Sequence, residues 1–134
     1  LMDTFSGLSK EHVSDEEKIS GIHKYRYAEC YDEVVRTFSG FSNVKIIRGP
    51  IPETLVQVNV RSVCYLHIDM NCVLPEIAAA EFFWGKLVPG AIIVLDDYGW
   101  AKHINQKRAF DAFARSKSVG ILSLPTGQGL IVKV

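Results

Sequence analysis

The chain has 134 residues, of which 48% are hydrophobic and 22% charged, as is typical of a soluble globular domain. Its 15 lysines and arginines balance 15 aspartates and glutamates, so no net field would attract a polyanion, and we expect no nucleic-acid partner. No apolar stretch is long enough to span a membrane, and a signal-peptide pattern is absent. Three cysteines without a C-x-x-C pair favour a reducing compartment, so we predict a cytoplasmic protein with no membrane contact.

The first half of the chain shows short segments of alternating type. Turn residues and apolar spacing define their limits. In chain order the pattern predicts a strand end at 1–8, a mobile loop or short surface helix at 9–24, a helix at 27–39, a strand at 44–48 and a brief helix or turn at 52–58.

Two apolar runs further along the chain end in carboxylates. Residues 63–68 lead to Asp69, and residues 91–95 lead to Asp96 and Asp97. An unbroken apolar run is typical of a buried parallel strand, and open α/β sheets bind ligands beyond the carboxyl ends of their strands. If the two strands are neighbours, the three acids converge and repel each other unless a cation or a proton intervenes. The pattern therefore suggests a divalent metal site.

The remaining elements indicate the fold class. A helix is predicted at 74–87, closed by Pro89-Gly90, and another at 106–117. Two β-rich runs, 119–124 and 130–134, flank a turn and predict an antiparallel hairpin. Strands that alternate with helices indicate a mainly parallel sheet, so we predict one α/β domain with an antiparallel C-terminal hairpin.

Three motifs in order resemble the macrocin O-methyltransferase family, class I S-adenosylmethionine-dependent enzymes that methylate hydroxyls of sugars or other small molecules with the help of a metal. The motifs are Asp3-Thr4-Phe5-Ser6-Gly7-Leu8, then His67-Ile68-Asp69-x-Asn71, then Pro89-Gly90-x-Ile92-Ile93-Val94-x-Asp96-Asp97-Tyr98-Gly99. The resemblance covers most of the chain and implies a Rossmann-like methyltransferase fold. It also implies S-adenosylmethionine and Mg²⁺ as cofactors and a small-molecule hydroxyl as substrate, and leaves a homo-oligomer open.

The resemblance assigns a role in cofactor binding to the first motif. Asp3 would approach the ribose or adenosine end of S-adenosylmethionine, with Phe5 and Ser6 nearby.

The other two motifs supply the acids. Asp69, Asp96 and Asp97 match the family's metal-binding residues, and Asp69 also fits the general base that accepts the hydroxyl proton. Asn71 stands where the family usually has a second aspartate, which keeps an oxygen ligand but removes a charge. Mg²⁺ prefers carboxylates and water, and as a Lewis acid it would lower the pKa of the accepting hydroxyl.

The family's glycine-rich cofactor loop has no counterpart here, because Gly127-x-Gly129 lies in the hairpin and not between a strand and a helix. The chain is then either an N-terminally truncated, partial methyltransferase-like domain spanning residues 1–134 or a reduced relative, and we favour truncation. The alternative function is a non-catalytic α/β remnant with a role in assembly or ligand binding. A metal-dependent hydrolase is a weaker third hypothesis.

Other residues near these motifs receive structural interpretations. We expect His67 and Cys64 to be core residues of their strand, and His103 to be an exposed loop histidine, with a role as an alternative base less favoured. Tyr98 and Trp100 either line a substrate pocket or pack under the loop, and the sequence leaves both open.

Overall fold

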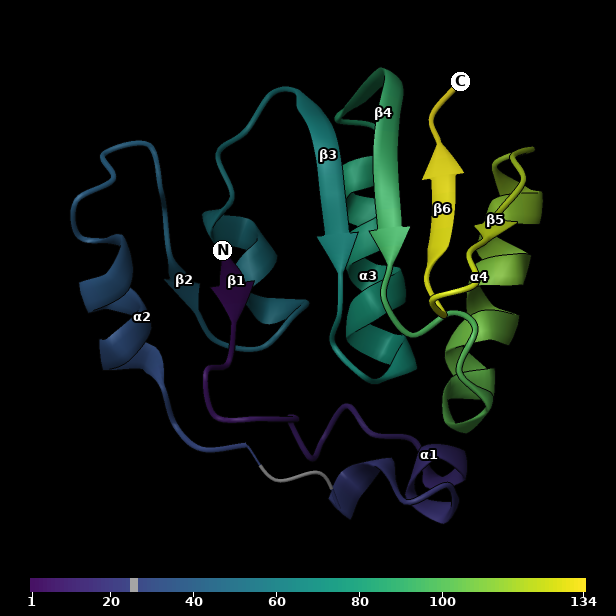
Figure 1. The fold of residues 1–134 in the computed structure, drawn as a ribbon, viewed down its shortest axis with the longest axis horizontal. Coiled ribbons are helices and arrows are strands. Elements are labelled where there is room, and N and C mark those ends of the chain that lie inside the picture. The colour runs from purple at the N-terminus through teal and green to yellow at the C-terminus, as the bar shows by residue number, and fades with distance from the viewer. Residues whose placement is uncertain (25–26) are drawn as a thin grey trace.

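The structure is a computed structural model that describes residues 1–24 and 27–134, apart from the side chain of His23. Its strands form two sheets, which stand side by side in Figure 1. β1 pairs with β2 in parallel, and the larger sheet has the order β3-β4-β6-β5, with β3 and β4 parallel and β6 antiparallel to both neighbours. The strands are β1 (Met2–Asp3), β2 (Ile47–Arg48), β3 (Val63–Ile68), β4 (Leu87–Leu95), β5 (Leu122–Ser123) and β6 (Gly129–Val132). The α/β class and the antiparallel C-terminal hairpin are confirmed.

Helices occupy most of the connections. They are α1 (Asp15–Ile19), α2 (Tyr31–Phe38), α3 (Val73–Trp84) and α4 (Ile104–Ser116), with 3₁₀ turns η1 (Ile22–Lys24), η2 (Glu53–Gln57) and η3 (Ala101–His103). None of the helices in the described ranges combines the length and apolar character that a bilayer crossing requires.

The carboxyl ends of β1, β3 and β4 lie at one edge of the molecule, where their arrowheads point in the same direction in Figure 1. α1 lies beyond this edge, next to the ends of α3 and α4 in the figure. The chain thus gathers its strand tips and the segment around α1 on one side.

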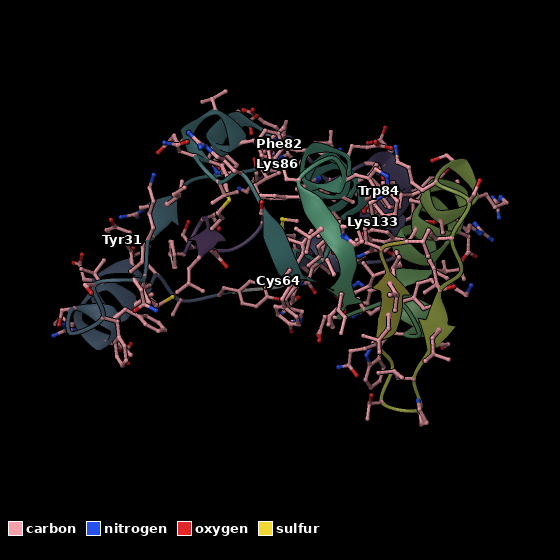
Figure 2. The ribbon with its side chains drawn as sticks, turned by 90° about the horizontal axis from the view of Figure 1, so that it is seen from above. Tyr31, Cys64, Phe82, Trp84, Lys86 and Lys133 are labelled. Atoms are coloured by element: carbon pink, nitrogen blue, oxygen red, sulfur yellow. The ribbon has the colours of Figure 1, made fainter. Side chains whose placement is uncertain are left out.

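The main core lies between the larger sheet and the helices α3 and α4. Alternate side chains of the central strands face this core, because successive residues of a strand point to opposite faces. Ile93 is fully buried and pairs in register with Leu66 and Ile131. Phe110 and Phe113 of α4 close the core with an edge-to-face ring contact. A second contact joins α3 to α4 and to the residue after β6: Trp84 packs edge-to-face on Phe113, and Lys133 Nζ lies over the Trp84 ring. Trp84 and Lys133 are neighbours in Figure 2.

The opposite face of the larger sheet is open, which corrects our expectation of fully buried strands. Figure 2 shows α3 and α4 on one side of the sheet and no described helix on the other. Tyr65 of β3, Ile92 of β4 and Val132 of β6 are accordingly exposed. Cys64 and His67 are exposed too, so the prediction that they are core residues is wrong.

Two predicted boundaries shift for identifiable reasons. The helix predicted from residue 27 starts at Tyr31, since the amide of Cys30 donates to the carbonyl of Phe5 and ties that segment to the loop after β1. Pro89-Gly90 does not end a helix but lies within β4. Gly90 adopts a φ of 83°, a backbone conformation that glycine reaches without strain. Its amide donates to the carbonyl of Lys133 at 2.7 Å, so hydrogen bonding to the C-terminal segment continues at this residue.

Candidate active site

A cavity of about 280 Å³ opens at the strand tips, between the ends of β1, β2 and β3. Its lining includes Asp3, Phe5 and Ser6 from the loop after β1, and Asp69 and Asn71 from the turn after β3. The structure therefore brings the residues predicted for cofactor binding and the predicted base to one hollow. Ligands of open α/β sheets bind at such positions.

The loop after β1 is held by the side chain that the sequence singled out. Asp3 Oδ1 accepts a hydrogen bond from the amide of Phe5 and another from the hydroxyl of Thr4. Phe5 has a φ of 57° and packs its buried ring edge-to-face against Tyr31. The second oxygen of Asp3 makes no hydrogen bond to the parts of the chain that the structure describes, so it remains available to a ligand in the cavity.

Asp69 follows β3 directly and stands at the rim of the cavity. Partial burial and the neighbouring charge of Asp96 raise the pKa of Asp69, with a further contribution from Asp3 and opposite ones from His67 and His103. The side-chain Nδ2 of Asn71 donates to Asp69 Oδ1 at 3.3 Å. Asn71 itself has a φ of 58°, a left-handed conformation that asparagine tolerates better than most residues. The turn thus presents an acid whose proton affinity is increased.

The tips of β3 and β4 are joined by the backbone, since the amide of Asp96 donates to the carbonyl of Ile68 at 3.0 Å. Asp96 Oδ1 accepts from Gln128 at 3.1 Å and lies 3.6 Å from His67 Nε2. His67 is therefore an exposed neighbour of the acids. Neither Asp96 nor Asp97 lines the cavity, so these two acids lie beside it. Asp69 both lines the cavity and interacts with Asp96.

Asp97 is paired with a histidine that we expected to be exposed. His103 is only 5% exposed, and its Nδ1 lies 3.4 Å from Asp97 Oδ2 and 2.7 Å from Gln106 Nε2. It is buried because it ends the 3₁₀ turn that leads into α4 and so faces the protein. Burial raises the pKa of Asp97, the charge of His103 opposes this, and the charges of Asp69 and Asp96 add to it.

Most of the chain, residues 1–121, matches the family model described as macrocin-O-methyltransferase (TylF). The chain belongs to this family. Its structure is similar to that of the O-methyltransferase NovP, with a TM-score of 0.80 at 16% identity over 99% of this chain and 58% of that one. It is also similar to the calicheamicin methyltransferase CalS11, with a TM-score of 0.71 at 18% identity over 98% of this chain and 58% of that one. No curated protein sequence matches it.

The chain therefore spans 58% of the length of each of these two structures. At such low identity the likeness shows the fold, which is the Rossmann-like methyltransferase fold that the sequence predicted.

The acids of this macrocin-O-methyltransferase family member are chemically suited to a hard divalent cation. Asp97 Oδ2 is buried and accepts no hydrogen bond from the described residues. Burial raises the pKa of Asp69 and of Asp97, and the charge of Asp96 adds to this in both cases. Carboxylate oxygens are the ligands that Mg²⁺ prefers. Among the described residues, however, no three side chains of histidine, cysteine, aspartate or glutamate are arranged to hold a metal ion. The donor set fits in kind, while its side chains are not gathered around one point.

Two buried glutamates near the site were missed by the sequence reasoning. Glu76 of α3 is 3% exposed, and its Oε1 accepts from the amide of Met70 at 3.2 Å. Burial raises the pKa of Glu76 to about 8, and the charges of Asp97 and Asp69 contribute. Glu17 of α1 is fully buried. No apolar pattern marks either residue, although Ser14 and Glu17 have the S-x-x-E spacing of a helix capping box.

The two aromatic residues after Asp97 were expected either to line a substrate pocket or to pack under the loop. Tyr98 is buried, and its hydroxyl donates to Asp111 Oδ1 at 2.6 Å and accepts from Lys107 at 3.1 Å. Tyr98 thus packs under the loop. Trp100 is 57% exposed and does not line the cavity at the strand tips.

Proposed function

We propose that this chain acts in the metal-assisted, S-adenosylmethionine-dependent methylation of a hydroxyl group on a sugar or another small molecule. The observation that supports this most is the shared cavity, in which the Asp3 loop and Asp69 face one volume. Family membership supports the reaction class, and the adjacent Asp96 and Asp97 support metal assistance.

The cofactor side of the cavity is the loop after β1. S-adenosylmethionine, when bound, supplies a methyl group activated by the positive sulfur. The free oxygen of Asp3 would accept hydrogen bonds from the ribose hydroxyls, since carboxylates accept from such donors strongly. The loop of Phe5 and Ser6 would border the adenosine.

The acceptor side is the turn after β3. Asp69 would take the proton from the substrate hydroxyl. At the same time the hydroxyl oxygen would bond to the methyl carbon, and the carbon–sulfur bond of the cofactor would break. Its raised pKa favours this role, because a general base works best when its pKa lies closer to the working pH. Holding hydroxyl and methyl in near-attack geometry would supply the rest of the acceleration.

Asp69, Asp96 and Asp97 would hold the Mg²⁺ ion, with Asn71 as a neutral oxygen donor nearby. The ion would stabilise negative charge on the substrate oxygen as a Lewis acid. The exposed and free Cys64 agrees with a reducing, cytoplasmic setting.

The proposal is tested by Asp69→Asn in the full natural chain, with Asp32→Asn on the exposed surface of α2 as the control. Methyl transfer from labelled S-adenosylmethionine to a panel of free sugars is measured together with Mn²⁺ binding. We expect Asp69→Asn to reduce turnover by roughly 10²- to 10⁴-fold, the usual contribution of a general base, and to weaken Mn²⁺ binding. Unchanged transfer and unchanged Mn²⁺ binding in Asp69→Asn would refute the proposal.

A further inference from the structure

The segment expected to be a mobile loop, residues 9–24, is anchored through a buried carboxylate. Glu17 has no exposed surface, and both of its oxygens are used. Oε2 accepts from the amide of Ser14 at 2.9 Å and from its hydroxyl at 2.8 Å, which closes the capping box of α1. Oε1 accepts from the amide of Val73 at 2.7 Å, across 56 positions in the chain.

This second contact replaces a missing cap on α3. A helix leaves its first amides without partners, and a serine, threonine or aspartate at the N-cap usually satisfies one of them. The N-cap of α3 is Cys72, whose side chain makes no capping hydrogen bond. Pro75 in the first turn has no amide to satisfy. Glu17 therefore caps α3 from another element.

The residues between β3 and α3 are consequently held at both ends. Glu76 accepts from the amide of Met70, and Glu17 accepts from that of Val73, while Asp69 and Asn71 lie on the same turn. Cys72 is buried beside both glutamates: burial raises the pKa of its thiol to about 12, and the charges of Glu17 and Glu76 contribute. The turn that carries the proposed base is thus enclosed by two buried carboxyl groups.

We propose that Glu17 is a positioning residue for the acid site: by capping α3 it holds the Asp69–Cys72 turn in the shape that presents Asp69 to the cavity. The inference rests on the function proposed above for Asp69. The α1 segment lies beyond the strand ends in Figure 1, and the hydrogen bond from the Val73 amide to Glu17 connects it to the turn. The docking of α1 would thus help to order the Asp69–Cys72 turn, called the acid turn below. Residues that hold metal-binding side chains in position through hydrogen bonds typically change metal affinity or activity 10- to 100-fold when they are removed.

The experiment uses Glu17→Ala and Glu17→Gln in the full natural chain, with the exposed neighbour Glu16→Ala as the matched control. Amide hydrogen exchange is followed at Met70, Asn71 and Val73, and Mn²⁺ affinity is measured by electron paramagnetic resonance. We expect Glu17→Ala to speed exchange at all three amides and to weaken Mn²⁺ binding roughly tenfold. Glu17→Gln keeps one acceptor oxygen for two sets of donors, so it should show a partial loss, and it decides the question if the alanine variant does not fold.

The proposal is overturned if faster exchange is confined to Val73 and Mn²⁺ affinity stays at the level of the control, because Glu17 would then be a helix cap only. If the wild-type chain itself binds no Mn²⁺, the metal part of the proposed function fails. Exchange at Met70 and Asn71 would still decide whether Glu17 orders the turn.

Discussion

Replacing Glu76 by glutamine should remove a large pH dependence of stability. Glu76 is 3% exposed beneath the acid turn, and burial together with the charges of Asp97 and Asp69 raises its pKa from 4.5 to about 8. In the unfolded chain the carboxyl ionises near pH 4.5, whereas the folded chain keeps its proton up to about pH 8. The folded state therefore binds the extra proton between these limits. Stability from this group is complete below the lower limit, declines as the pH rises to the upper one and is constant above it.

The magnitude follows from about 1.4 kcal/mol per pH unit for one proton. Between pH 5 and pH 8 the wild-type chain should lose roughly 3 kcal/mol of unfolding free energy through Glu76 alone. Glutamine carries no titrating proton and still offers an oxygen to the amide of Met70. The free energy of unfolding of Glu76→Gln, relative to that of the wild type, should therefore rise by roughly 3 kcal/mol across this range.

The assay is urea unfolding of both proteins at several pH values in metal-free buffer. Glu33→Gln, on the exposed surface of α2, controls for the removal of one carboxyl group. A stability difference between Glu76→Gln and wild type that stays constant from pH 5 to pH 8 would show that Glu76 ionises normally. The electrostatic description of the turn would then be wrong.

Two further predictions concern the core and the acids. Ile93→Ala, at a fully buried position, should lower the free energy of unfolding by about 2–5 kcal/mol in urea. Ile92→Ala, at a position 40% exposed on the open face, should lower it far less. Equal losses of unfolding free energy would mean that the open face is covered. Asp96→Asn in metal-free protein should lower the pKa of Asp69, since the charge of Asp96 raises it, and a carbon-detected NMR titration that finds no change would contradict the proximity of the two acids.

The order of elements could be predicted from the sequence because apolar spacing and turn residues are local signals. The acid-tipped runs predicted β3 and β4 as parallel strands, and the register of Ile68 with Leu95 shows that the two are neighbours. The exposure of one sheet face could not be predicted, since an apolar run is the same whether or not a layer covers it. His67 and Cys64 were therefore misplaced.

The support of the site could not be predicted for a different reason. The contact of Glu17 with Val73 spans 56 positions, and no local sequence pattern distinguishes a buried glutamate from an exposed one. The pairing of His103 with Asp97 depends on the 3₁₀ turn that leads into α4, which no periodic pattern announces. Local chemistry at the strand tips was readable, whereas the long-range hydrogen bonds that hold it were not.

A crystal structure of the full natural chain grown with Mn²⁺ and S-adenosylhomocysteine would show directly whether the acids and the cavity bind these two ligands. We predict an anomalous manganese peak bonded to carboxylate oxygens of Asp69, Asp96 and Asp97, and the nucleoside in the cavity with its ribose on Asp3. Manganese absent from these acids at saturating concentration, or the nucleoside bound away from Asp3, would contradict this prediction.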